Sequence, residues 1–292
     1  MPGAMLKHPI ETEMASPRVL SRDELRRLDA DAVREMGVPS IVLMENAALG
    51  ACRGVLRLLG GIGGGPVAVL CGTGNNGGDG LALARQLHIR GRRVRVLLTG
   101  DPDRLTPDAA ANLTALKACR VEAEHLDAAD EGGAERAAGD WLARVGPALI
   151  VDALLGTGLS REVRGPLRGV IEAINEAGKA GACVVSLDLP SGLDADTGRP
   201  LGAAVRAHAT MTFAALKRGF FTLEAQGFVG EIELLPIGVP SELTGRYGVV
   251  FEDTADAPSR FDPPHGSGET EPTGTGRDAG EPGDLGGRGV GM

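Results

Sequence analysis

Short runs rich in apolar residues alternate with helical segments through the middle of the chain. Six runs are long enough for one strand each, and they read PVAVLC (66–71), RVRVLL (93–98), ALIVDAL (148–154), CVVSLDL (183–189), ATMTFAA (209–215) and GEIELLPI (230–237). Amphipathic segments such as LALARQLHIRG (81–91) and PLRGVIEAINEAG (166–178) lie between them. Apolar strands that alternate with helices are typical of a parallel sheet covered on both faces. The pattern therefore predicts a doubly wound α/β fold with a mostly parallel sheet.

Two helices are expected ahead of the first of these strands. Ser21 and Glu24 have the spacing of a capping box, and an apolar stripe of helical period follows them. Gly37 and Pro39 should end that helix. Residues 40–60 then predict a second, more apolar helix.

The composition changes at both ends of the chain. Residues 1–19 are polar and irregular, which predicts a disordered lead-in. Residues 251–292 are rich in glycine, proline and acidic residues, and they hold too few apolar side chains to offset the entropy of ordering. We therefore expect a disordered tail there, and one folded domain over residues 20–250.

Composition and charge exclude several classes of protein. The net charge of -9 argues against a nucleic-acid partner and against an anionic membrane surface. The four cysteines form no CxxC pair, so neither structural zinc nor a disulfide framework is expected. No signal peptide or membrane span is evident, and a cytoplasmic location is the expectation.

A glycine-rich turn follows the first of the six strands. Within CGTGNNGGDG (71–80), Gly72, Gly74 and Gly77 match the pattern G-x-G-x-x-G. Glycines at such a turn let backbone amides approach a pyrophosphate at the positive end of the next helix. That match alone would also be typical of a nicotinamide dehydrogenase. It does not explain Asp79. This side chain either caps the helix or contacts a ligand.

Two further strands end in polar residues beside glycine turns. Asp152 lies in VDALLGTG (151–158), and Asp188 and Ser191 lie in SLDLPSG (186–192). A charge in an apolar strand is costly unless it is paired, protonated or bound to a cation. Because parallel strands present their carboxyl ends at one edge, these side chains should converge there with Asn76.

Lys217 follows another strand end, in FAALKRGF (213–220), and could reach the same edge. A solvated surface lysine is the simpler interpretation, and it is our expectation.

Six segments occur in order and resemble one known family. They are LMENA (43–47), CGTGNNGGDGL (71–81), VDALLGTGLSREVRGP (151–166), SLDLPSGLDADTG (186–198), TFAALKRG (212–219) and GEIELLPIGVP (230–240). Together they resemble the NAD(P)H-hydrate epimerase family over roughly residues 20–241. The resemblance implies a three-layer α/β/α, Rossmann-like fold, a homodimer and a potassium ion. It also implies an isomerase of metabolite repair that interconverts the R and S forms of hydrated NADH and NADPH. A dehydratase specific for the S form would act next, here on another chain.

The resemblance also assigns roles to individual residues. Substrate binding is implied for Asp188 and for two segments, which comprise Asn75, Asn76, Gly77, Gly78 and Asp79, and then Gly156, Thr157, Gly158, Leu159, Ser160, Arg161 and Glu162. Potassium ligands are implied at Asn76, Asp152 and Ser191. Asp188 is the candidate catalytic residue, because a carboxylate beside the hydroxylated ring carbon can move a proton and stabilise a transient positive charge.

Two other functions remain possible at this point. A non-catalytic nucleotide-binding or protein-interaction module of the same fold should lose the polar site residues, which this sequence retains. A nicotinamide dehydrogenase could use Asp101 or Asp103 to hold a ribose, but it would leave the Asp152 and Asp188 motifs unexplained.

Overall fold

The computed structural model describes residues 10–12, 14, 16–62 and 64–251. The strands are β1 (Ile10–Thr12), β2 (Arg18–Leu20), β3 (Val67–Cys71), β4 (Val94–Leu98), β5 (Ala123–His125), β6 (Leu149–Ala153), β7 (Cys183–Leu187), β8 (Ala209–Phe213), β9 (Leu216–Lys217), β10 (Glu231–Leu235) and β11 (Val249–Val250). The α-helices are α1 (Arg22–Met36), α2 (Ser40–Gly61), α3 (Asn75–His88), α4 (Pro107–Ala118), α5 (Glu131–Val145), α6 (Pro166–Lys179) and α7 (Ser241–Thr244). Short 3-10 turns cover Pro102–Arg104, Arg218–Phe221 and Ala225–Gly227. Within this part of the chain, no helix is long and apolar enough to cross a membrane.

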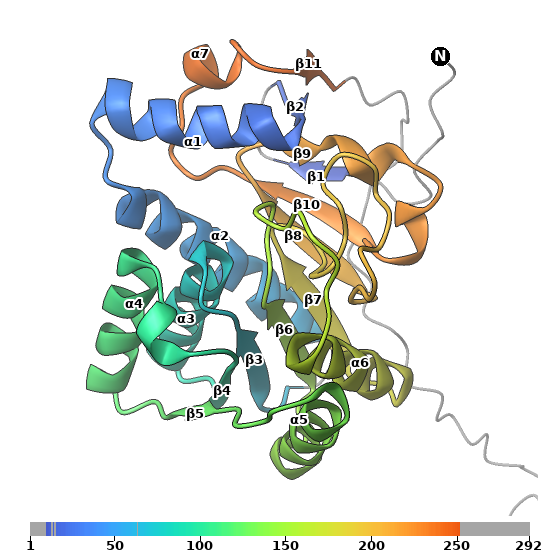
Figure 1. The fold of residues 1–292 in the computed structure, drawn as a ribbon. Coiled ribbons are helices and arrows are strands. Elements are labelled where there is room, and N and C mark those ends of the chain that lie inside the picture. The colour runs from blue at the N-terminus through green and yellow to red at the C-terminus, as the bar shows by residue number, and fades with distance from the viewer. Residues whose placement is uncertain (1–9, 13, 15, 63, 252–292) are drawn as a thin grey trace, which may run out of the picture.

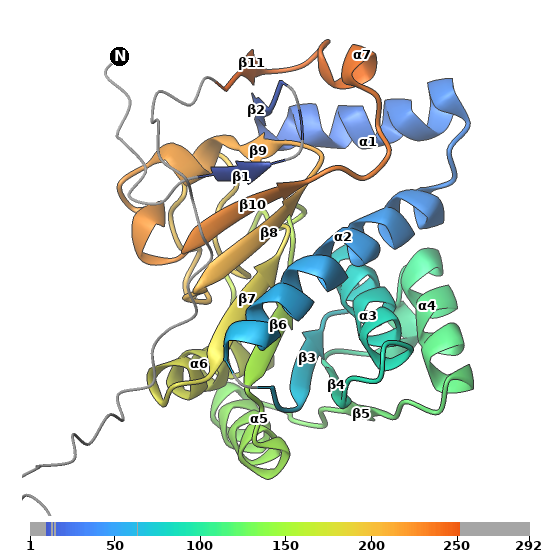
Figure 2. The ribbon, with the colours of Figure 1, turned by 180° about the vertical axis from the view of Figure 1, so that it is seen from behind.

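The main sheet has eight strands in the order β1-β10-β8-β7-β6-β3-β4-β5, and every neighbouring pair is parallel. Helices α2, α3 and α4 pack on one face, and α5 and α6 pack on the other (Figures 1 and 2). This confirms the predicted three-layer, doubly wound α/β fold. From β3 the chain runs to β4 and β5 on one side and then returns to β6 on the other. The strand order therefore reverses beside β3, which is where open α/β sheets bind their ligands.

The central strands are apolar because both of their faces are covered. All five residues of β3 are buried. Val67 and Val69 join the core beneath α2–α4, whereas Ala68 and Leu70 join the core beneath α5 and α6. Each of the six predicted strands contains one strand of this sheet, so the apolar runs located six of its eight strands.

Helix α1 begins and ends as the sequence predicts. The Ser21 side chain accepts a hydrogen bond from the Glu24 amide, and the Glu24 carboxylate accepts one from the Ser21 amide. At the other end, Gly37 has a φ of 67°, a left-handed conformation that glycine adopts without steric cost.

A second, small sheet joins the two ends of the domain. Strand β2 lies between β11, with which it is antiparallel, and β9, with which it is parallel. The predicted disordered lead-in was therefore wrong for residues 10–12, which form β1, and for residues 18 and 19, which belong to β2. Backbone pairing to β10 and β9 orders segments that have too few apolar side chains to show a strand pattern. Of the predicted tail, all but Phe251 lies outside the described residues.

Two glycines let β3, α3 and the chain after β6 approach one another closely. A Cβ at Gly72 would lie 2.0 Å from the Leu154 carbonyl oxygen, and a Cβ at Gly77 would lie 1.9 Å from the Gly72 carbonyl oxygen. These contacts are with backbone atoms, which cannot turn aside as a flexible side chain does. The glycine pattern is thus required for packing whatever ligand the turn binds.

Replacing Gly77 with alanine should lower the free energy of unfolding by about 1–3 kcal/mol, the usual cost of overpacking. The reason is the clash with the Gly72 carbonyl, and urea denaturation would measure the loss. Gly74→Ala is the matched control, because a Cβ there meets nothing within 4 Å. It should lose no more than the roughly 1 kcal/mol that alanine costs at a helix N-cap. Equal losses in the two variants would contradict this explanation.

Candidate functional site

A cavity of about 1250 Å³ opens at the carboxyl edge of the main sheet. Its walls come from α1, α2, the amino end of α3, the ends of β3, β4, β6 and β7, and the segment that follows β6. Pockets for small ligands commonly enclose roughly 300–1,000 Å³. The cavity is therefore large enough for an extended ligand such as a dinucleotide.

The amino end of α3 points into this cavity. Gly72, Thr73, Gly74 and Asn75 all line it, and Gly74 is the residue before the first turn. The unpaired amides and the dipole of a helix end attract anions, so this wall is suited to phosphate groups.

The sequence predicts that residues 75–79 belong to a glycine-rich turn, and the structure differs from this prediction. They form the beginning of α3, with Asn75 as its first residue. Asparagine and glycine are poor helix formers, so local propensity gave no sign of this turn. Asp79 lies past the first turn and so does not cap the helix; its side chain lines the cavity instead. Gly77 and Gly78 are buried behind the cavity wall.

Asn76 is buried with only half of its amide group satisfied. Its Nδ2 donates a hydrogen bond of 2.9 Å to the Leu155 carbonyl oxygen. Its Oδ1 is buried and accepts no hydrogen bond from any residue that the structure describes. Buried polar atoms are nearly always paired, so this oxygen is oriented to accept something that the protein itself does not supply.

Asp152, at the end of β6, is fully buried and serves as an acceptor for several donors. It accepts hydrogen bonds from the Ser186 hydroxyl at 2.7 Å and from the Leu154 amide at 3.2 Å. The amide of Ser191 donates to it at 2.8 Å, and the Ser191 hydroxyl donates as well. Burial raises the pKa of Asp152 and these hydrogen bonds oppose the rise.

The Leu155 peptide connects the two polar residues that flank it. Its amide donates to the Ser191 hydroxyl at 2.8 Å, and its carbonyl lies within hydrogen-bonding distance of Ser191 Oγ, at 3.1 Å. The same carbonyl accepts from Asn76. Asn76 and Ser191 thus both contact the backbone of Leu155, and Ser191 also bonds Asp152, which brings together the ends of β3, β6 and β7.

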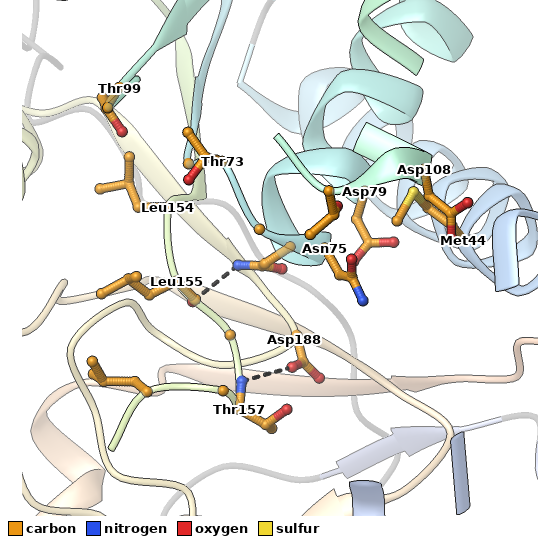
Figure 3. A pocket seen from close by; sticks show the side chains of 18 of the residues that line it. Met44, Thr73, Asn75, Asp79, Thr99, Asp108, Leu154, Leu155, Thr157 and Asp188 are labelled. Carbon is orange, nitrogen blue, oxygen red and sulfur yellow. Dashed lines mark hydrogen bonds between the residues drawn. The ribbon is translucent and has the colours of Figure 1, made fainter. Parts of the chain in front are cut away.

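Asp188 follows β7 directly and has a φ of 63°. A left-handed conformation is uncommon for any residue with a Cβ, although aspartate tolerates it better than most. Backbone bonds to β8 hold it there: its amide donates to the Met211 carbonyl, and its carbonyl accepts from the Thr212 hydroxyl, both at 2.8 Å. Its carboxylate faces the cavity and accepts from the Thr157 amide at 3.3 Å (Figure 3).

The expectation that Lys217 is a solvated surface lysine was wrong. Lys217 is 1% exposed, and its ammonium forms an ion pair with Asp188. Its place after a strand end was a sign that it could reach this edge, but the partner of its ammonium, Asp188, lies in a different segment of the chain.

Three carboxyl groups face the cavity near this lysine. Asp79 and Asp188 come from α3 and from the end of β7 (Figure 3), and Asp29 comes from α1. Desolvation, followed by the charge of Asp188, raises the pKa of Asp79 well above its ordinary value. The same two causes raise the pKa of Asp29 to about 6. A carboxyl with a raised pKa stays protonated to a higher pH, so Asp79 can donate a hydrogen bond that an ordinary aspartate could not.

The second predicted segment, residues 156–162, lines two adjoining pockets. Gly156, Thr157, Gly158, Leu159, Ser160 and Arg161 all line the large cavity. Glu162 does not; it lines a smaller adjoining pocket and pairs with Arg164. Glu162 is therefore the one member of this segment that the structure turns away from the main cavity.

Comparisons with known proteins agree with this geometry. Residues 40–219 match the family model described as "YjeF-related protein N-terminus". An "NAD(P)H-hydrate epimerase" of Rhodopirellula baltica is 37% identical over 225 residues, which cover 77% of this chain and 86% of that protein. A "Bifunctional NAD(P)H-hydrate repair enzyme Nnr" of Salinibacter ruber is 40% identical over 239 residues, which cover 81% of this chain. The match covers 43% of that bifunctional protein, so the chain spans less than half of its length.

A solved structure shows the same fold. The crystal structure of the yeast protein ynu0 superposes with a TM-score of 0.66 and covers 82% of this chain and 97% of that one. The two sequences are 23% identical, so the likeness concerns the fold alone.

Replacing Asp79 with asparagine should raise the Tm at pH 8 and leave it nearly unchanged at pH 4. A raised pKa means that the folded state holds this proton more tightly than the unfolded state does. The stability contribution is therefore fully present below the ordinary pKa of 3.8 and is lost as the pH rises through the folded-state value. Thermal unfolding between pH 4 and pH 8 would measure the difference. Asp140→Asn, at an exposed position of α5, is the control. If the difference in Tm between Asp79→Asn and the wild type does not depend on pH, the prediction is wrong.

Proposed function

The chain belongs to the YjeF-related N-terminal family, which includes the NAD(P)H-hydrate epimerases, and from this premise we propose that it interconverts the R and S forms of hydrated NADH and NADPH. The activity is that of an isomerase in metabolite repair. One observation carries the proposal: the amino end of α3 and the carboxylate of Asp188 face the same cavity. A phosphate-binding element and an acid–base group thus share one space large enough for a dinucleotide.

We propose one orientation for the substrate in the cavity. Its pyrophosphate would lie against the amides at the start of α3, where the helix end attracts negative charge. Its hydrated ring would then reach the wall that carries Asp188 and Asp79. The segment from Gly156 to Arg161, which contacts Asp188 through the Thr157 amide, would line the ring and the ribose beside that carboxylate.

The chemistry requires inversion at the hydroxylated ring carbon beside the ring nitrogen. A proton passes to the hydroxyl, the carbon–oxygen bond breaks, and water leaves as the nitrogen lone pair forms an iminium-like cation. Water then returns to the other face, its oxygen bonds to the carbon, and it gives up one proton. Asp188 is the proposed group for the proton transfers: as a carboxylic acid it gives its proton to the leaving hydroxyl, and the carboxylate so formed would stabilise the cation and then take a proton from the returning water. No electron is gained or lost, so the nicotinamide is substrate here and not a hydride carrier.

A potassium ion is proposed beside this centre, held by Asn76, Asp152 and Ser191. The observation that supports it is the buried Oδ1 of Asn76, which accepts no hydrogen bond among the described residues. Amide, carboxylate and hydroxyl oxygens suit a hard cation. The described part of the chain offers no cluster of three or more His, Cys, Asp or Glu side chains that could hold a metal. The ion would supply a fixed positive charge that keeps Asp152 ionised in its buried site.

The proposed partners follow from the relatives. The Salinibacter ruber relative is named as a bifunctional repair enzyme and is much longer than the region matched here. We infer that a dehydratase on another chain consumes the S form, that this protein works in the cytoplasm, and that it forms a homodimer. A non-catalytic module of the same fold is the alternative, but it would have no use for a buried lysine paired with a cavity aspartate.

Asp188→Asn should slow the epimerisation by about 10²–10⁴-fold, the usual contribution of a positioned acid–base group. The assay mixes the R epimer with the variant and an S-specific dehydratase, and it follows the return of reduced cofactor by absorbance. Asp140→Asn is the matched control and should keep the wild-type rate, because that side chain is exposed on α5. If the wild-type protein gives no acceleration, the proposed function is wrong; if only Asp188→Asn keeps full activity, the role of Asp188 is wrong.

Exchanging potassium for choline should lower both the epimerase rate and the Tm. An ion that binds only the folded state stabilises it by mass action, and the Tm should rise with KCl until the site is saturated. Thermal unfolding at constant ionic strength measures this without any substrate. Asn76→Leu should abolish the potassium-dependent rise, and an equal rise in that variant would exclude Asn76 as a ligand.

A further inference from the structure

Lys217 places a buried positive charge at the cavity, and neither the phosphate-binding turn nor the potassium ligands account for it. It lies in β9, where its backbone pairs with Leu20 of β2. Its Nζ pairs with Asp188 and donates to the carbonyl oxygens of Phe213 at 3.2 Å and Ala215 at 3.3 Å. An ammonium group has three protons to donate, and each has an acceptor here. The lysine is therefore held in one position.

The two members of this ion pair differ in how far they are exposed. The Lys217 side chain is 1% exposed, and the Asp188 side chain is 15% exposed. The carboxylate is thus the accessible member, and the ammonium supports it from within the protein. One carboxylate oxygen, Oδ1, pairs with the lysine, while Oδ2 accepts from the Thr157 amide. These two contacts fix the plane of the carboxylate.

Stability alone does not explain such a pair. Buried ion pairs are often no more stabilising than apolar side chains of the same size, because the loss of hydration is so costly. Asp188 also lies near the carboxyl groups of Asp29 and Asp79, whose charge would repel that of Asp188 and attract that of Lys217. Lys217 is the group that lowers the pKa of both of these aspartates, while Asp188 raises it.

We propose that Lys217 is the positioning residue of the reaction: its ammonium fixes the carboxylate of Asp188 toward the bound ring. This proposal rests on the proposed epimerase function. Asp188 would then carry out the proton transfers and stabilise the cation, while Asp79 serves as a hydrogen-bond donor.

The test compares Lys217→Met with Lys217→Arg in the coupled epimerase assay. Lys217→Met should lower kcat by about 100-fold, the scale of a misplaced catalytic group, and leave KM within about threefold. It should also move the acidic limb of the pH–activity profile to higher pH. The reason is that Asp29, Asp79 and Asp188 face one another from α1, α3 and the end of β7, and Asp108 adds to the negative field at Asp79. Without the lysine, Asp29 and Asp79 take up protons more readily.

Lys217→Arg keeps the charge but cannot reproduce the three contacts of an ammonium. It should lower kcat and leave the pH profile in place. Lys179→Met, at an exposed position of α6, is the matched control and should behave as wild type. In the double variant Lys217→Met/Asp188→Asn, the rate should equal that of Asp188→Asn alone, because the lysine would then have no carboxylate to position.

The outcomes separate this inference from the function on which it rests. An inactive wild-type protein overturns the proposed function. An active wild type with a Lys217→Met variant of unchanged kcat and pH profile overturns the role of Lys217 alone, as does a double variant that loses the product of both single effects. Should Lys217→Met fail to fold, Lys217→Arg decides: full kcat overturns the proposal, and a reduced kcat with an unmoved pH profile supports it.

Discussion

The buried carboxylate of Asp152 is the interaction on which the geometry of the cavity depends. A charge with no exposure to water is tolerable only when donors surround it, and Leu154, Ser186 and Ser191 supply them. These donors come from the two neighbouring strands and the turns that follow them. Ser191 in turn accepts a hydrogen bond from the Leu155 amide, and the Leu155 carbonyl accepts one from Asn76 at the start of α3. Three strand ends are therefore held in fixed relation, and the cavity wall is rigid before any ligand arrives.

Asp188 shows why the two acidic strand ends behave so differently. Asp152 lies in β6 and Asp188 directly follows β7, its neighbour in the sheet, yet Asp152 points into the protein and Asp188 points into the cavity. The left-handed backbone of Asp188 turns its side chain out of the strand register and toward Thr157 and Lys217. One aspartate thus builds the site and the other is free to act in it. An aspartate at a strand end can therefore be structural or can face a ligand, and the backbone conformation decides between these roles.

The sequence predicted those features that depend on local pattern. Apolar runs located the six predicted strands, and the Ser21 capping box with Gly37 bounded α1. The polar strand ends also indicated the correct edge of the sheet. It could not predict the burial of Lys217, because the ion pair with Asp188 joins two separate segments of the chain. It also gave no sign of β2, a three-residue strand whose pairing with β9 has no periodic signal. It also missed the helical state of residues 75–79, where packing of Gly77 against Gly72 overrides poor helix propensity.

The small sheet of β2, β9 and β11 has a consequence for biosynthesis. It brings together segments from opposite ends of the domain, and Arg18 bonds the Gly248 carbonyl 230 positions further along the chain. Contacts between such distant segments form late, because closing a long loop costs entropy before any pairing compensates for it. The nascent chain on the ribosome would therefore complete most of the parallel sheet first. Lys217, in β9, would reach Asp188 only after that strand had emerged, so a shorter nascent chain would carry a phosphate-binding turn without a complete acid–base centre.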